Sequence, residues 1–226
     1  HRNTRRQRQM CIRDSLHIGH FINNLQEFDK WTRPAFDLTI NQTQFSPNVR
    51  YKVDDFIFNL GSQLSILDNK NNQDERLMPD AASLSVGPYV TIDYEGNNFG
   101  FNYGMRYDYK SIISEDSYSN TDYDNQFSNT SFSSGIYFDL ADHILRLSYS
   151  GAYRAPHFSE LFSEGVHHGT NRYELGNENL NIEFSNQIDF KYQWSNEHFG
   201  IVFNPFLQII SDFISIIPTD SIASNY

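Results

Sequence analysis

The sequence has one cysteine, Cys11, no long run of apolar residues and few basic residues. A single cysteine excludes a disulfide framework within the chain and a cysteine-based metal site. No run approaches the roughly 18 apolar residues of a membrane-spanning helix, although a barrel strand needs only about 9–11. The formal charge of −11 leaves no basic surface to replace the counterions of nucleic acid. We therefore expect no nucleic-acid partner.

The chain is also poor in aliphatic residues for its length of 226 residues. Hydrophobic residues make up 38 % and aromatic residues 15 %, with 14 Tyr and 19 Phe. A globular domain normally carries a larger apolar share. An aromatic-rich, aliphatic-poor chain with many Asn and Ser suits a wall that is one residue thick and wet on one side.

The sequence does contain repeated period-two alternation of apolar and polar residues. This pattern indicates β-strands, because successive side chains of a strand point to opposite faces. One face of 99–109 carries Phe99, Phe101, Tyr103, Met105, Tyr107 and Tyr109, and the other Gly100, Asn102, Gly104, Arg106, Asp108 and Lys110. The segment 182–194 alternates in the same way. Weaker alternation runs over 36–45, 56–66, 86–94, 132–140, 145–153 and 199–209, and a poorly defined strand is expected near 17–28.

Short and long connections alternate between these strands. The short turns are 95–98, 141–143 and 195–198, and the long connections are 68–82, 111–130 and 154–181. In an outer-membrane barrel the short turns face the periplasm and the long loops face outside. The pattern predicts an all-β fold, a transmembrane antiparallel up-and-down β-barrel of which about nine strands are present.

A soluble carbohydrate-binding β-sandwich also alternates and is the alternative fold. Its strands usually have about five to six residues, whereas those predicted have about ten to thirteen. Aromatic residues also gather at strand ends, as interfacial girdles do in membrane barrels; they are Tyr94, Phe99, Tyr107, Tyr109, Trp194 and Phe199.

Residues 1–15 differ from the remainder, because they hold five of the 17 basic residues and the only cysteine. No apolar stretch follows the basic residues, so the segment is not a signal peptide. We predict a leader that is disordered or not native to the protein, with a basic periplasmic arm as the alternative. Residues 16–226 are predicted to form the partial barrel.

Several motifs together resemble one family, the TonB-dependent outer-membrane receptors. The first is Gly104, Arg106, Tyr107 and Asp108, which resembles the "GxRYD" strand of these receptors. The second is Tyr153, Arg154, Ala155 and Pro156, which resembles the "GFRAP" box and is followed by Glu160 and Leu161. The third is Gly176, Asn177, Leu180 and Glu183, which resembles "GNPxLxxE", with Glu178 in place of the proline.

The resemblance implies a receptor and transporter in the outer membrane of a Gram-negative bacterium. Members have barrels of about 22 strands and a plug domain in the lumen. We therefore expect this chain to be a fragment without the plug or the final strands. The implied partners are the TonB energy-coupling complex, acting through the plug, the outer-membrane lipid and a small metal-chelate ligand. The alternative is a passive or adhesive barrel without a plug.

The resemblance leaves the transported ligand open among a ferric siderophore, haem, zinc and cobalamin. Haem receptors of the family carry a histidine between their "FRAP" and "NPNL" boxes, and His167 and His168 occupy the corresponding stretch here. Imidazole is a common ligand for zinc and haem iron. His167, His168 and His157 are thus candidate ligand contacts, and solvated histidines are the alternative. No cofactor is required, and without a nucleophile elbow or a phosphate-binding glycine loop we expect no enzyme.

Overall fold

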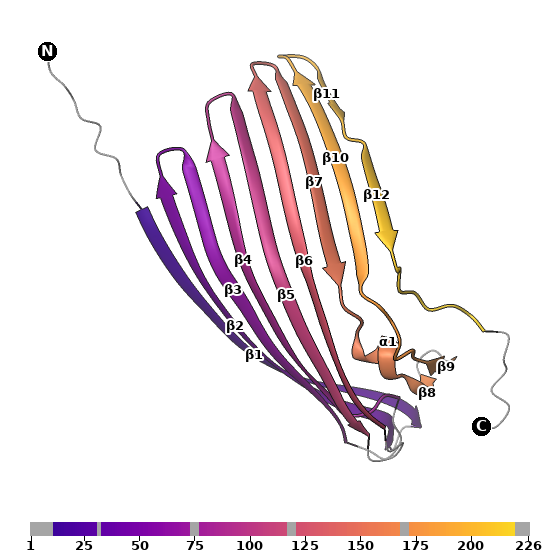
Figure 1. Cartoon of the computed structure of the whole chain (residues 1–226). Coiled ribbons are helices and arrows are strands. Elements are labelled where there is room, and N and C mark those ends of the chain that lie inside the picture. Colours follow the sequence, from indigo (N-terminus) through magenta and orange to yellow (C-terminus); the bar gives the residue numbers. More distant parts are fainter. Residues whose placement is uncertain (1–10, 31–32, 73–76, 117–120, 168–171, 220–226) are drawn as a thin grey trace, which may run out of the picture.

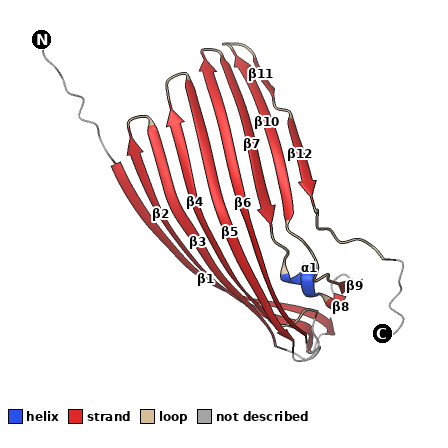
Figure 2. Cartoon of the chain, viewed as in Figure 1, coloured by secondary structure: helices blue, strands red, loops and turns tan. Residues whose placement is uncertain are grey.

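The computed structural model describes residues 11–30, 33–72, 77–116, 121–167 and 172–219, which form one curved sheet and a small hairpin (Figures 1 and 2). The sheet contains β1 (Cys11–Lys30), β2 (Arg33–Val53), β3 (Phe56–Asn71), β4 (Ala81–Glu95), β5 (Phe99–Asp116), β6 (Thr121–Leu140), β7 (His143–Arg154), β10 (Glu183–Ser195), β11 (Gly200–Phe203) and β12 (Phe206–Ser211). The connection between β7 and β10 contains α1 (Phe158–Phe162) and the hairpin of β8 (Glu164–His167) and β9 (Arg172–Leu175).

Every strand of the sheet pairs antiparallel with its neighbours in chain order. β11 and β12 both pair with β10 in a single register, Tyr192 opposite Phe203 and Asp189 opposite Phe206. Pro205 separates the two pieces, because proline cannot donate a ladder hydrogen bond. The predicted strand 199–209 therefore occupies one place in the sheet as two pieces, β11 and β12. Counted in this way, the prediction of about nine strands is confirmed. A sandwich needs two facing sheets, whereas all the described strands except the β8–β9 hairpin form one open sheet.

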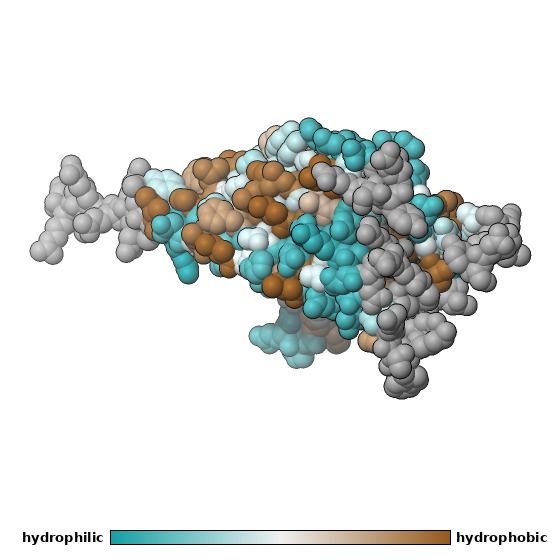
Figure 3. All heavy atoms as spheres, turned by 90° about the horizontal axis from the view of Figure 1, so that it is seen from below, coloured by the Kyte–Doolittle hydropathy of each residue, from teal (hydrophilic) through white to brown (hydrophobic). Residues whose placement is uncertain are grey.

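One face of the sheet is apolar along all its central strands. Phe101 lies opposite Tyr94 and Ile136, and Met105 opposite Val90 and Phe132. Many of these side chains are open to the surroundings, among them Leu60 at 64 %, Met105 at 44 % and Leu147 at 47 %. A broad hydrophobic area is visible beside a hydrophilic one from the end at which α1 lies (Figure 3). We call the face of the sheet that carries Phe101 and Met105 the apolar face.

Aromatic side chains of the apolar face gather near the tight turns. Ring centroids are 5.0 Å apart for Phe56 and Tyr94, 5.6 Å for Tyr94 and Phe101, and 5.1 Å for Phe99 and Phe138. The turns themselves are short, and Asp54 and Ala141 have φ values of 50° and 52°, as two-residue hairpin turns require. Tyr94 and Phe99 of the predicted girdle lie in this row. Tyr107 and Tyr109 lie within β5, which continues to Asp116, so their prediction as strand-end residues was wrong.

The opposite face carries hydrogen-bonded polar pairs, and we call it the polar face. Asn48 Nδ2 donates to the Tyr89 hydroxyl at 3.0 Å, and Asn59 Nδ2 to Thr91 Oγ1 at 2.8 Å. Farther along the sheet, Gln187 Nε2 donates to Asp189 Oδ1 at 2.9 Å. The sheet therefore has the two chemically different faces that the alternation predicted.

Two of the three predicted long loops are shorter than expected, and that part of the prediction was wrong. β5 and β6 pair without interruption up to Asp116 opposite Thr121, so most of 111–130 is strand. Likewise β3 continues to Asn71 and β4 begins at Ala81. In these strand ends Ile112 and the adjacent Ile113 place apolar side chains on both faces among polar neighbours, which removes the alternation that marked the other segments.

The other predictions on chain organisation have different outcomes. The predicted connection 154–181 is confirmed, although α1 and the β8–β9 hairpin within it were not foreseen. Residues 11–15 of the predicted leader lie in β1, opposite residues 48–52 of β2. Residues 1–10 lie outside the described residues, so the origin of the leader stays a prediction. No helix in the described part of the chain is long and apolar enough to cross a membrane.

Candidate functional site

The connection between β7 and β10 folds onto the polar face at the end of the sheet away from the tight turns. Phe158, Leu161 and Phe162 of α1 pack with Ile112 of β5 and Phe127 of β6 in one buried cluster. Both strand residues belong to the polar face. Ile112 is an even-numbered residue of β5, as Arg106 is, and Phe127 is an odd-numbered residue of β6, as is Ser131, the partner of Arg106. Two of the three sequence motifs lie in or beside this connection, which makes it the candidate functional site.

Arg154 joins the end of β7 to α1 and to the start of β10. Its Nη1 donates to Glu160 Oε1 and Oε2, both at 2.8 Å, and its Nη2 to Glu183 Oε2 at 3.2 Å. A guanidinium has the planar fork that suits paired carboxylate contacts. The second and third sequence motifs are therefore held together by one side chain, a contact that resemblance alone does not specify.

A capping box starts α1 and explains the residues after Arg154. His157 Nδ1 accepts from the Ser159 amide at 3.3 Å, and Glu160 Oε2 accepts from the His157 amide at 2.7 Å. Each side chain satisfies an amide that lacks a partner at a helix start. Lys110 Nζ also donates to the Pro156 carbonyl at 3.2 Å. Burial, and next the Lys110 charge, lower the pKa of His157, so the imidazole is neutral at neutral pH and serves as a cap.

The third motif returns the chain to the sheet along α1. A Cβ on Gly176 would lie 2.5 Å from the Leu161 carbonyl oxygen, so only glycine permits this close approach. The Gly176 amide donates to the Ser163 carbonyl at 2.6 Å, and the Asn177 amide to the Glu160 carbonyl at 2.9 Å. Asn177 Oδ1 accepts from the Asn179 amide at 3.0 Å, which is an Asx turn. Leu180 then packs on the buried cluster.

The first motif lies on β5, away from α1. Arg106 Nε donates to Asp108 Oδ1 at 2.6 Å, and its Nη1 to Gln63 Oε1 at 2.7 Å. Tyr107 points to the apolar face, and Gly104 leaves room for Ser133 Oγ, 2.8 Å from where a Cβ would stand. Gln63 carries no sequence signal for this role, because its partner is 43 residues away.

His167 connects the β8–β9 hairpin to the distant strand β1. Its Nε2 lies 2.8 Å from Glu27 Oε1 and its Nδ1 lies 3.1 Å from Glu174 Oε1. No cluster of three or more His, Cys, Asp or Glu suited to a metal occurs among the described residues. His168 lies outside them. Contact of His157, His167 or His168 with a metal or haem therefore stays a prediction.

We expect the docking of this hairpin on β1 to weaken as the pH rises. The hydrogen bond to Glu174, and then that to Glu27, raise the pKa of His167 above 6.5. Arg172, whose Nη2 lies 3.4 Å from Glu174 Oε1, is the neighbouring cation. A raised pKa gives a stabilisation that is complete below 6.5 and is lost as the pH rises through the higher value.

Amide hydrogen exchange of residues 164–167, corrected for its intrinsic pH dependence, measures this change. Protection should be greater at about pH 6 than at about pH 8.5, and His167→Gln should remove the difference. Equal protection of the unaltered hairpin at both pH values would contradict the expectation.

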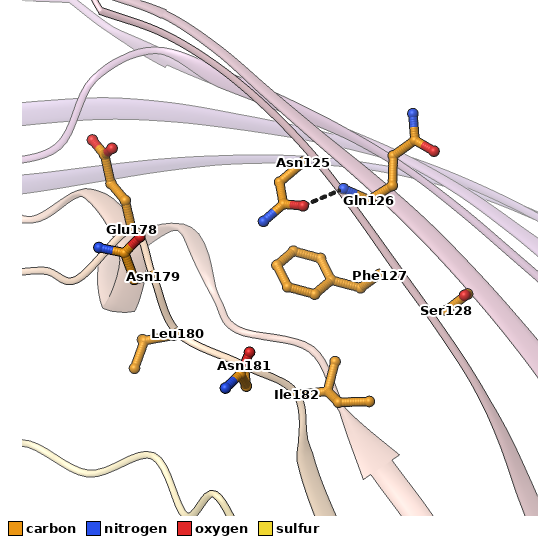
Figure 4. Close-up of a pocket in the computed structure, with 9 residues that line it drawn as sticks. All are labelled: Asn125, Gln126, Phe127, Ser128, Glu178, Asn179, Leu180, Asn181 and Ile182. Carbon is orange, nitrogen blue, oxygen red and sulfur yellow. Dashed lines mark hydrogen bonds between the residues drawn. The ribbon is translucent and has the colours of Figure 1, made fainter.

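A cleft of about 480 Å³ lies between β6 and the chain that leads into β10 (Figure 4). Its lining consists of Asn125, Gln126, Phe127, Ser128, Glu178, Asn179, Leu180, Asn181 and Ile182. β7 pairs with β6 only from Phe132 onward, so this part of β6 has β5 alone as a neighbour in the described sheet. Asn125 Oδ1 accepts from the Gln126 amide at 2.8 Å, in place of a bond to another strand.

Comparisons with known proteins agree with this architecture. The family model described as "TonB dependent receptor-like, beta-barrel" matches residues 4–226. The copper transporter OprC has a similar structure, with a TM-score of 0.67 and 15 % identity over 89 % of this chain and 36 % of that one. The FrpB iron transporter from Neisseria meningitidis (F3-3 variant) is also similar, with a TM-score of 0.61 and 14 % identity over 83 % of this chain and 30 % of that one.

A third similar structure is a double mutant of the Serratia marcescens hemophore receptor HasR in complex with its hemophore HasA and heme. Its TM-score is 0.56 and its identity 12 %, over 88 % of this chain and 40 % of that one. The chain thus spans less than half the length of each of these relatives, and the likeness to them is one of fold. No curated protein sequence matches the chain significantly.

Proposed function

The chain belongs to the TonB-dependent receptor family, and we propose that it forms part of the barrel wall of an outer-membrane transporter that takes up a metal chelate. The location is the outer membrane of a Gram-negative bacterium, with lipid against the apolar face. The polar face lines the lumen and, in the complete receptor, meets a plug domain through which TonB supplies the energy.

The observation that supports this proposal best is the pair of unlike faces on one open sheet. The apolar face exposes Leu60, Met105 and Leu147, which is favourable in lipid and unfavourable in water. The polar face holds its amides, hydroxyls and charges in internal hydrogen bonds. β2 has 21 residues and β5 has 18, more than the roughly 9–11 that cross a bilayer, so both extend past it on the side of α1.

A metal chelate is proposed as the cargo because the relatives of similar fold are named as transporters of copper and iron and as a hemophore receptor. Ferric siderophore, haem, zinc and cobalamin types all belong to this class. The connection with His157 and His167 folds onto the polar face at the end of the sheet away from the tight turns, so it lies beside the path of a ligand that enters the lumen from that end. The passive or adhesive barrel remains an outcome of the test below.

Uptake by cells that express the complete receptor tests the proposal. We expect accumulation of at least one of a ferric siderophore, haem, zinc or cobalamin, and we expect it to stop when TonB is deleted. Accumulation that persists without TonB would identify a passive barrel. Absence of any uptake, with the receptor present in the outer membrane, would contradict the transport function itself.

The histidine contribution has a separate test in the same cells. Affinity for each chelate is compared between the unaltered receptor and its His167→Ala/His168→Ala variant. A loss of affinity for one chelate would assign the histidines to that ligand, and unchanged affinity for all of them would exclude the histidines from binding.

A further inference from the structure

We propose that the cleft between β6 and the chain preceding β10 binds a neutral or cationic saccharide, with Glu178 as the residue that selects it. The cleft is the one lined by Asn125–Ser128 and Glu178–Ile182. Its volume of about 480 Å³ falls within the ~300–1,000 Å³ of small-molecule sites. Its place outside the bilayer rests on the proposed orientation of the barrel, but its chemistry does not.

The polar groups of the cleft suit hydroxyl groups. Amide side chains both donate and accept hydrogen bonds, as a pair of neighbouring sugar hydroxyls does. Asn179 and Asn181 are exposed, and no side-chain hydrogen bond joins either of them to another residue in the described part of the chain. The cleft therefore presents amide groups that a ligand can engage without breaking an internal bond.

An apolar floor completes the surface that a sugar ring requires. Phe127 is buried, and its ring lies between Asn125 and the stretch from Leu180 to Ile182 (Figure 4). Leu180 and Ile182 pack on the same buried cluster as Phe127. The floor is thus held from below by α1, and a ligand with an apolar C–H face can rest on it.

The charge of the cleft selects among saccharides. Glu178 is exposed and is the single ionisable residue among the described residues that line the cleft. An anionic ligand would face this carboxylate without compensation, whereas a hydroxyl or amino group can donate to it. Glu178 also stands where the family motif has proline, so this carboxylate is a property of this chain and not of the motif.

Binding of three probes to the complete receptor in detergent, measured by calorimetry, tests the proposal. The probes are a neutral glucan tetrasaccharide, a glucosamine tetrasaccharide and oligogalacturonate. We expect the first two to bind and oligogalacturonate to bind at least about tenfold more weakly than glucosamine, since a charge-assisted hydrogen bond contributes about 1.5–3 kcal/mol and 1.4 kcal/mol is tenfold.

The variants separate the cleft from the remainder of the surface. Glu178→Gln keeps the shape and should weaken glucosamine binding about tenfold or more, with little effect on the neutral glucan. Asn181→Ala should weaken both saccharides. Glu164→Gln, an exposed carboxylate on β8 outside the cleft, is the matched control and should change neither.

Three results would overturn the proposal. They are absence of binding by both saccharides, equal effects of Glu178→Gln and Glu164→Gln, and binding of oligogalacturonate as tight as that of glucosamine. If Glu178→Gln instead impaired uptake of a metal chelate, the cleft would belong to the transported ligand. Failure of saccharide binding leaves TonB-dependent uptake intact, so the two proposals fail separately.

Discussion

Replacing Met105 with arginine is expected to destabilise the receptor in the membrane by about 2–4 kcal/mol. Met105 lies on the apolar face of β5, between Val90 and Phe132, and is the seventh residue after the tight turn that precedes Phe99. A span of about 9–11 residues crosses the hydrocarbon, so this position is near its middle. An arginine there must be held in lipid or must distort the bilayer around it.

Ser148→Arg provides the matched control for this prediction. Ser148 lies on the polar face of β7, opposite Gly135 and Asp189, so a new arginine would meet water and a carboxylate. Urea unfolding of the complete receptor in lipid vesicles, followed by gel mobility, gives both free energies. An equal or larger loss for Ser148→Arg would contradict the assignment of the two faces.

Replacing Leu161 with alanine is expected to weaken the docking of the β7–β10 connection by about 2–5 kcal/mol. Leu161 is 1 % exposed and packs in the buried cluster with Ile112 and Phe127. The cavity left by alanine removes contacts that hold α1 on the polar face. Because the cluster lies at one end of the sheet, the loss is local, and the strands near the tight turns should keep their stability.

Hydrogen exchange measures this local effect. Amides of 159–163 should exchange at least about thirty-fold faster, since each 1.4 kcal/mol is tenfold, while those of 100–106 should not change. Leu175→Ala is the control, because Leu175 lies in the same connection but is 76 % exposed. Equal effects of the two variants would show that α1 is not held by this cluster.

The architecture could be predicted from sequence where the two faces differ in chemistry. Residues 99–109 alternate cleanly because their odd positions lie on the apolar face and their even positions lie on the polar face. The prediction failed in 111–116 and 121–130, because apolar Ile112 and Phe127 lie there on the otherwise polar face, where α1 covers them, and the pattern of the other segments is lost. The interruption of the last strand at Pro205 was also not predicted. β11 and β12 continue in one register on either side of it.

The site was predictable only in part, for a related reason. The capping box at His157 and Glu160 and the Asx turn at Asn177 are local contacts. The close approach of Gly176 to Leu161 already joins residues fifteen positions apart. The contacts of Arg154 with Glu183 and of His167 with Glu27 span 29 and 140 residues. Such pairs depend on how the sheet curves, which the pattern of one strand does not contain.

The most direct test of the central claim, one face in lipid and one in the lumen, is a cysteine scan along β5 in the outer membrane. Cys11 is first replaced by serine, and single cysteines are placed at each position from 99 to 109 of the complete receptor. We predict that a water-soluble thiol reagent labels the even positions and leaves the odd positions unlabelled. A fluorophore attached to the odd positions with a membrane-permeant thiol reagent should be quenched by a nitroxide on lipid chains. Equal labelling of odd and even positions, or quenching of the even ones, would contradict the account.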